Sequence, residues 1–118
     1  MPCVAEMPHL VQVADEFADR GARIVGISED LFVPDVTPEQ ALAKVEAFVE
    51  QTEIPFPMLV LNAESTAGLD ERYDLPGGIP VTLAFDANGV EVDREESGAD
   101  LERLREMMRR AIGELPPR

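Results

Sequence analysis

The chain has 118 residues and a formal net charge of −14, with 24 acidic side chains against 10 basic ones. Such a surface repels the phosphates of nucleic acids and anionic lipids, so the composition argues against both as partners. Hydrophobic residues make up 45% of the chain, and no apolar run reaches the roughly 20 residues of a membrane-spanning helix. We expect one domain over residues 1–115, followed by a short tail at 116–118.

The first third of the chain predicts a helix and then a strand. Apolar residues at helical spacing indicate an amphipathic helix over residues 4–20, and Gly21 is suited to end it. Residues 23–28 form a short apolar run of strand type, which we expect to be buried on both faces.

A second helix is marked by a clear start signal. Thr37 is a good N-cap, Pro38 suits the first helical position, and Gln40 completes a capping box. The buried stripe of this helix is expected to consist of Leu42, Val45, Phe48 and Val49.

The second half of the chain continues the alternation. Asp86-Ala87-Asn88-Gly89 predicts a hairpin turn, with asparagine and glycine in the left-handed positions. The alternating acids Glu91, Asp93 and Glu95 indicate that the strand after this turn is an exposed, charged edge. The remaining expected elements are a strand at 58–61, a short helix at 65–73, a strand at 81–85, its partner at 90–94 and a helix at 100–112.

The stretch Gly77-Gly78-Ile79-Pro80 leads directly into the strand at 81–85. The two glycines allow a sharp turn, and an X-Pro bond is where a cis peptide costs little. An ordinary trans proline at the entry to a strand fits this stretch equally well.

Helices alternating with strands and ending in a hairpin predict an α/β sandwich with a mixed sheet.

Neither a metal nor a cofactor is expected. His9 is the one histidine of the chain, without a second histidine or cysteine at ligand spacing. Residues 86–93 superficially resemble a calcium loop, but their glycine is in the fourth position instead of the sixth, so a hairpin fits better.

The residues Met1-Pro2-Cys3-Val4-Ala5-Glu6-Met7-Pro8-His9-Leu10 resemble the second half of a Trp-Cys-x-Pro-Cys-x-x-Glu-x-Pro-x-Leu motif. That motif belongs to the TlpA/ResA branch of the thioredoxin-like thiol-disulfide oxidoreductases. Residues 73–82 resemble the family's tyrosine-glycine-proline-threonine loop, and residues 85–89 its Asp-x-x-Gly turn. The resemblance extends over essentially the whole chain and implies a thioredoxin-like three-layer α/β/α sandwich.

The resemblance also implies a mechanism. Two cysteines at the start of the first helix exchange disulfides with protein partners, the first as attacking thiolate and the second as resolving thiol. Cys3 matches the resolving cysteine, and Pro80 matches a cis-proline that packs beside the pair. Glu6 is either a proton relay or a first-turn acid favoured by the helix dipole. Residues expected to contact the substrate chain are Pro2, Gly78 and Ile79.

One departure from the family is large. The attacking cysteine and the first central strand of the fold would both lie before Met1, so we expect the chain to be truncated at its N-terminus. As it stands, it holds only the resolving thiol. The resemblance implies a bacterial periplasmic or extracytoplasmic location. Two alternatives stay open: a redox-inactive thioredoxin-like module that binds proteins, and, less favoured, a peroxiredoxin-like antioxidant protein.

Overall fold

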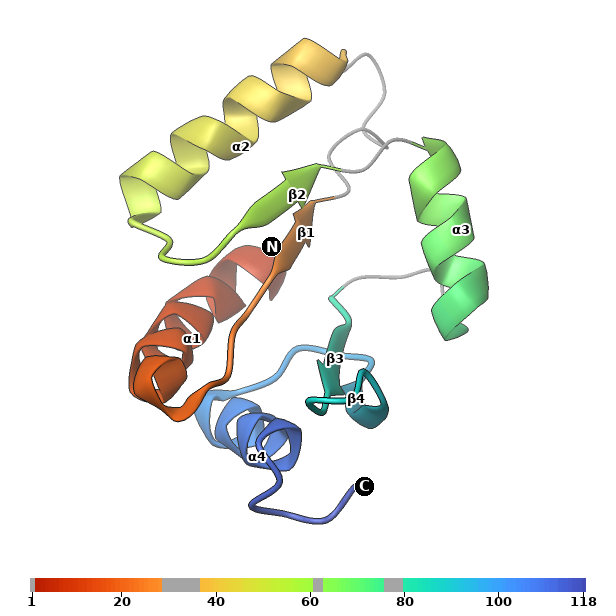
Figure 1. Cartoon of the computed structure of the whole chain (residues 1–118). Coiled ribbons are helices and arrows are strands. Elements are labelled where there is room, and N and C mark those ends of the chain that lie inside the picture. Colours follow the sequence, from red (N-terminus) through yellow and green to blue (C-terminus); the bar gives the residue numbers. More distant parts are fainter. Residues whose placement is uncertain (1, 29–36, 61–62, 76–79) are drawn as a thin grey trace. The chain divides into compact units, whose positions relative to one another are not determined.

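The computed structural model describes residues 2–28, 37–60, 63–75 and 80–118 (Figure 1). By contacts the chain divides into two compact units, unit 1 (Met1–Arg23 and Gly77–Arg118) and unit 2 (Ile24–Pro76). The elements in chain order are α1 (Pro2–Phe17), the 3-10 helix η1 (Ala18–Arg20), β1 (Gly26–Ser28), α2 (Pro38–Thr52), β2 (Met58–Val60), α3 (Ala63–Tyr73), β3 (Thr82–Phe85), β4 (Glu91–Glu95) and α4 (Leu101–Ala111). The alternation expected from the sequence is therefore confirmed, although β1 is shorter than the expected strand at 23–28 and β4 begins one residue later than expected.

The sheet of unit 1 is the antiparallel hairpin of β3 and β4. Its turn is closed by the Gly89 amide, which donates to the Asp86 carbonyl over 3.0 Å. The Asp86 carboxylate accepts from the amides of Asn88 and Val90. Gly89 is left-handed, with φ of 78°, but Asn88 is not, so the expectation of two left-handed residues was wrong. Within the ladder, a register shift lies between Ala84 and Phe85.

The core of unit 1 lies where α1 and α4 pack together and where α4 covers the hairpin. The Asp100 carboxylate caps α4 by accepting from the Arg103 amide over 2.8 Å. Gly21, with φ of 83°, ends η1, as its position in the sequence predicts. The buried apolar residues of this unit are Met7, Val13, Phe17, Ala22, Ala84, Val92, Ala99, Leu104, Met107 and Met108.

Unit 2 has a parallel pair of strands, β1 and β2, in which Ile27 lies opposite Leu59. Helix α2 contacts β2 and begins with the predicted capping box. The Gln40 amide donates to the Thr37 hydroxyl over 3.1 Å, and the Thr37 amide donates to the Gln40 side chain over 3.0 Å. The buried apolar residues of this unit are Ala41, Val45, Ile54 and Phe56.

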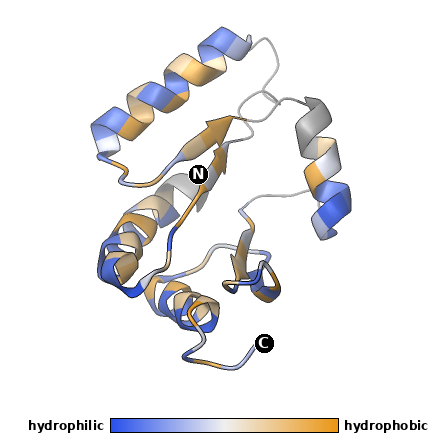
Figure 2. Ribbon diagram, viewed as in Figure 1, coloured by the Kyte–Doolittle hydropathy of each residue, from blue (hydrophilic) through white to orange (hydrophobic). Residues whose placement is uncertain are grey.

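Two expectations about burial in unit 2 were wrong. Val25 is 55% exposed and Ile27 43% exposed, so the first strand is not buried on both faces. Within this unit, the described residues cover one face of a two-stranded sheet, and the opposite apolar face stays open. Figure 2 shows both strands in the orange of hydrophobic residues. Leu42 is 50% exposed because the buried stripe of α2 is centred on Ala41 and Val45 instead.

The strands of the described residues form two sheets of two strands, one parallel and one antiparallel. The expected tail at 116–118 is tied to unit 1, since the Arg118 amide donates to the Val92 carbonyl over 2.9 Å. No helix in the described part of the chain is both long enough and apolar enough to cross a membrane.

Candidate functional site

The predicted site residues that the structure describes all belong to unit 1. Pro2 and Cys3 lie in the first turn of α1, where proline is well tolerated. Glu6 lies in the second turn of the same helix, three positions after Cys3, and positions with this spacing are neighbours on a helix surface. Pro80 lies two residues before β3. Gly78 and Ile79 lie outside the described residues, so their predicted roles remain predictions.

Glu6 is buried, with 5% of its surface exposed. Burial raises the pKa of its carboxyl group, and this effect outweighs a backbone hydrogen bond from Ala99 and a side-chain hydrogen bond from Thr82, which favour the ionised form. The Thr82 hydroxyl donates to Oε1 of Glu6 over 3.5 Å. A surface acid in the first turn, favoured by the helix dipole, would have a lowered pKa and a solvent shell. Glu6 is buried and lies beyond the first turn of α1, so it is not a solvated first-turn acid.

The contact between Glu6 and Thr82 joins two segments that lie far apart in the sequence. Glu6 follows Cys3 on α1, and Thr82 follows Pro80 at the start of β3. The structure therefore connects the helix that carries the cysteine with the strand that the proline precedes. The nearby His9 is half-buried, and its Nδ1 atom is buried without a hydrogen-bond partner in the structure.

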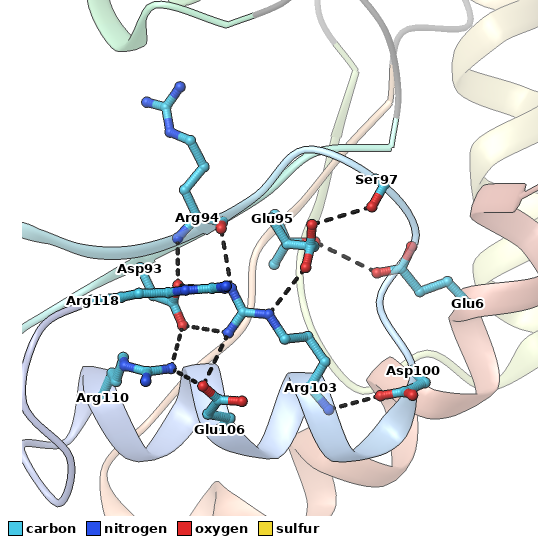
Figure 3. Close-up of polar contacts among 11 residues, drawn as sticks. Glu6, Asp93, Arg94, Glu95, Ser97, Asp100, Arg103, Glu106, Arg110 and Arg118 are labelled. Atoms are coloured by element: carbon cyan, nitrogen blue, oxygen red, sulfur yellow. Dashed lines mark hydrogen bonds and ion pairs between the residues drawn. The ribbon is translucent and has the colours of Figure 1, made fainter.

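A cluster of charges around Asp93 is the main feature that the sequence analysis missed (Figure 3). The Asp93 side chain is fully buried, although the alternation of acids predicted an exposed edge. Arg103 binds its carboxylate with two hydrogen bonds, of 2.6 and 2.8 Å, and Arg110 donates a third over 3.0 Å. The amide of Arg94 supplies a fourth, over 2.8 Å.

Burial and hydrogen bonding shift the pKa of the Asp93 carboxyl group in opposite directions. Burial alone would raise the pKa of Asp93, but the hydrogen bonds from Arg103, from the Arg94 amide and from Arg110 outweigh it and lower the pKa to about 2. Arg103 also donates to the Glu95 carboxylate and to the Arg94 carbonyl, which uses most of its donors. Because its charged groups are paired with one another, this cluster holds β4 against α4, and its role is structural.

One signal in the sequence could have identified this cluster. Arg103 and Arg110 are seven positions apart on α4, hence on one face, and they flank the apolar stripe of Leu104, Met107 and Met108. Arginines beside a buried stripe are partly buried themselves and require acidic partners.

Among the described residues, no group of three or more histidine, cysteine or acidic side chains is arranged to hold a metal ion. The candidate site in unit 1 comprises the start of α1, the buried Glu6 with Thr82, and Pro80 ahead of β3.

Comparison with known proteins identifies the family and the fold of the chain. The model of the AhpC/TSA family matches residues 1–92, and the chain belongs to that family. Among solved structures, it is similar to a thiol:disulfide interchange protein, a thioredoxin family protein from Chlorobium tepidum TLS, with a TM-score of 0.75 and 23% identity. The match covers 95% of this chain and 72% of that one, and the fold is thioredoxin-like. No curated protein matches the chain significantly.

Proposed function

We propose that the protein is a thiol-disulfide oxidoreductase of the TlpA/ResA kind, in which Cys3 is the resolving thiol. The observation that carries the proposal is the contact of Glu6 with Thr82, which links the helix of Cys3 to the strand after Pro80. Membership of the AhpC/TSA family and the likeness in fold to a thiol:disulfide interchange protein support the same chemistry.

The reaction needs two thiols on the protein. A first thiolate, which the resemblance places immediately before Met1, attacks one sulfur of a partner's disulfide and releases the other as a thiolate. The Cys3 thiolate then attacks the mixed disulfide, so that a protein disulfide forms and the second partner thiol leaves. The partner gains two electrons and the protein loses two.

The other site residues have distinct roles in this proposal. Glu6 accepts the proton of the Cys3 thiol before the second attack, because a buried carboxyl group with a raised pKa exchanges protons closer to neutral pH. The resemblance implies that Pro80, Gly78, Ile79 and Pro2 contact the partner's chain, with backbone groups beside the proline binding it.

The test compares the 118-residue chain with a variant extended by Trp-Cys and one further upstream strand segment, so that the sequence reads Trp-Cys-Met-Pro-Cys. We expect the extended variant to reach a redox equilibrium with glutathione that depends on the square of its concentration, and to reduce insulin disulfides. The same extension carrying Cys3→Ser is the matched control and should form only mixed disulfides.

Two outcomes would replace the proposal. An extended variant that stays folded but forms no internal disulfide would favour the protein-binding module. Consumption of hydrogen peroxide at rates far above those of free cysteine, without insulin reduction, would favour the peroxiredoxin-like alternative.

A further inference from the structure

Thr82 occupies a special place in the hairpin of unit 1. It is the first residue of β3 and lies opposite Glu95, the last residue of β4. Its hydroxyl group points at the buried Glu6 carboxyl group, 3.5 Å away. Serine, threonine and valine would all suit a strand at this position, but only a hydroxyl group can donate to a carboxylate.

The surroundings of Glu6 divide into groups that favour its ionised form and groups that oppose it. Burial opposes the carboxylate most, and the negative charge of Glu95 opposes it further. The backbone of Ala99, the hydroxyl of Thr82 and the charge of His9 favour it, in that order. Among these favourable groups, Thr82 supplies the side-chain hydrogen bond.

The charge of Glu95 is itself held in place. Arg103 donates to its carboxylate over 3.0 Å and Ser97 over 3.1 Å. These bonds lower the pKa of Glu95, so it stays ionised while Glu6 titrates. Thr82 therefore lies between a carboxylate of fixed charge across the hairpin and a carboxyl group of variable charge on α1.

We propose that Thr82 is a positioning residue, whose hydroxyl group orients the Glu6 carboxyl group for proton exchange with the Cys3 thiol. This inference rests on the proposed function of Glu6 and Cys3, and it adds the group that tunes them. In the step concerned, the Cys3 S–H bond breaks, its proton goes to a Glu6 oxygen, and the thiolate keeps the electron pair. Before that step Thr82 donates to Glu6 in its carboxylate state, and so favours the proton-accepting form.

The experiment compares Thr82→Val with Thr82→Ser and Glu6→Gln in the 118-residue chain. Two readouts are followed against pH: the carboxyl carbon-13 shift of Glu6, assigned by its loss in E6Q, and the alkylation rate of Cys3. Because Cys3 is the one cysteine of the chain, the alkylation rate reports a single site.

We expect Thr82→Val to move the Glu6 midpoint upward by about half a pH unit, since a hydroxyl donor at this distance is weaker than a full hydrogen bond. The lower step of the Cys3 profile should move with it, and E6Q should abolish that step. Thr82→Ser keeps the hydroxyl group and should therefore retain the wild-type midpoint of Glu6. A merely structural role of the threonine would not require this result. Thermal unfolding of each variant shows that the fold is kept, and Thr82→Ala replaces the valine variant if that one unfolds.

An unchanged Glu6 midpoint in folded Thr82→Val or Thr82→Ala overturns the proposal. A Cys3 profile without any step that depends on Glu6 overturns it as well, because Thr82 would then have nothing to transmit. If the midpoint and the Cys3 step both move while the extended chain performs no dithiol exchange, the positioning role stands and the oxidoreductase proposal fails.

Discussion

The two units of the molecule are stabilised by different means. Unit 1 contains eight of the ten basic residues, and the ion pairs of Asp93, Glu95, Glu16 and Glu114 all lie within it. Unit 2 contains only Lys44 and Arg72 against 11 acidic residues. Its described features include the parallel pair of β1 and β2 and the capping box of α2.

This difference shows where long-range side-chain pairing matters. In unit 1 a bidentate arginine joins β4 to α4, and Arg105 joins α4 to α1 through Glu16 with bonds of 2.8 and 2.9 Å. Helix α1, one of the elements that these bonds join, carries Glu6. In unit 2 stability has to come from burial of apolar side chains and from helix propensity, because cations are scarce. Four predictions test this contrast, from the largest expected effect to the smallest.

The largest effect is expected from Asp93→Asn in unit 1. The change leaves Arg103 and Arg110 partly buried without their shared carboxylate, which costs about 3 kcal/mol of unfolding free energy. Urea unfolding followed by circular dichroism measures it. The matched control is Glu46→Gln on the exposed face of α2, expected to change stability by less than about 0.5 kcal/mol. Equal effects of the two variants would contradict the contrast.

Lowering the pH should reveal how much the cluster around Asp93 contributes to stability. The pKa of Asp93 is lowered from 3.8 to about 2 in the folded chain, so its contribution is present above pH 3.8 and is lost as the pH falls towards 2. We expect about 2 kcal/mol of stability to disappear over that interval. Glu6 acts in the opposite direction, because its pKa is raised and its ionisation costs stability as the pH rises above 4.5. Unfolding curves between pH 2 and pH 7 should lose their acid limb in Asp93→Asn and keep it in Glu6→Gln.

Helix caps should matter equally in both units, since capping is local. Thr37→Ala removes the cap of α2, and Asp100→Ala removes the cap of α4. Each is expected to cost about 1 kcal/mol. Chemical denaturation of both variants checks this, and a cost for Asp100→Ala several times that for Thr37→Ala would mean that capping is coupled to the Asp93 cluster.

The smallest expected effect is a gain in stability from a substitution in unit 2. Gly68 lies within α3, is exposed, and has no atom within 4 Å of the place where a Cβ would be. Gly68→Ala should therefore stabilise the chain by about 0.5 to 1 kcal/mol through helix propensity. A shift of the thermal midpoint upward confirms it. In contrast, Gly26→Ala should destabilise, since its Cβ would overlap the Met58 side chain and force it to move.

The sequence predicted those features that depend on residues close together in the chain. Thr37 with Gln40, Asp100 and Gly21 each marked a helix end, and the structure places a cap or a left-handed residue at each one. Apolar spacing identified most of the buried face of α4, including Leu104, Met107 and Met108.

What the sequence could not predict depended on partners far away along the chain. The alternation of charges in β4 gave no indication that α4 would bring two arginines onto Asp93. The burial of Glu6 likewise depends on Thr82 and Ala99, more than 70 positions later. The choice of Glu6 came from a motif, and only the fold shows that this carboxyl group is removed from water.

The most direct test of the proposed chemistry is the intact mass of the protein from its natural source, before and after thiol alkylation. The proposed dithiol exchange predicts a mass above that of these 118 residues, with two alkylated thiols after reduction and none after oxidation. A mass equal to this chain with one alkylated thiol would contradict dithiol exchange within the protein, and would leave the protein-binding module as the better description.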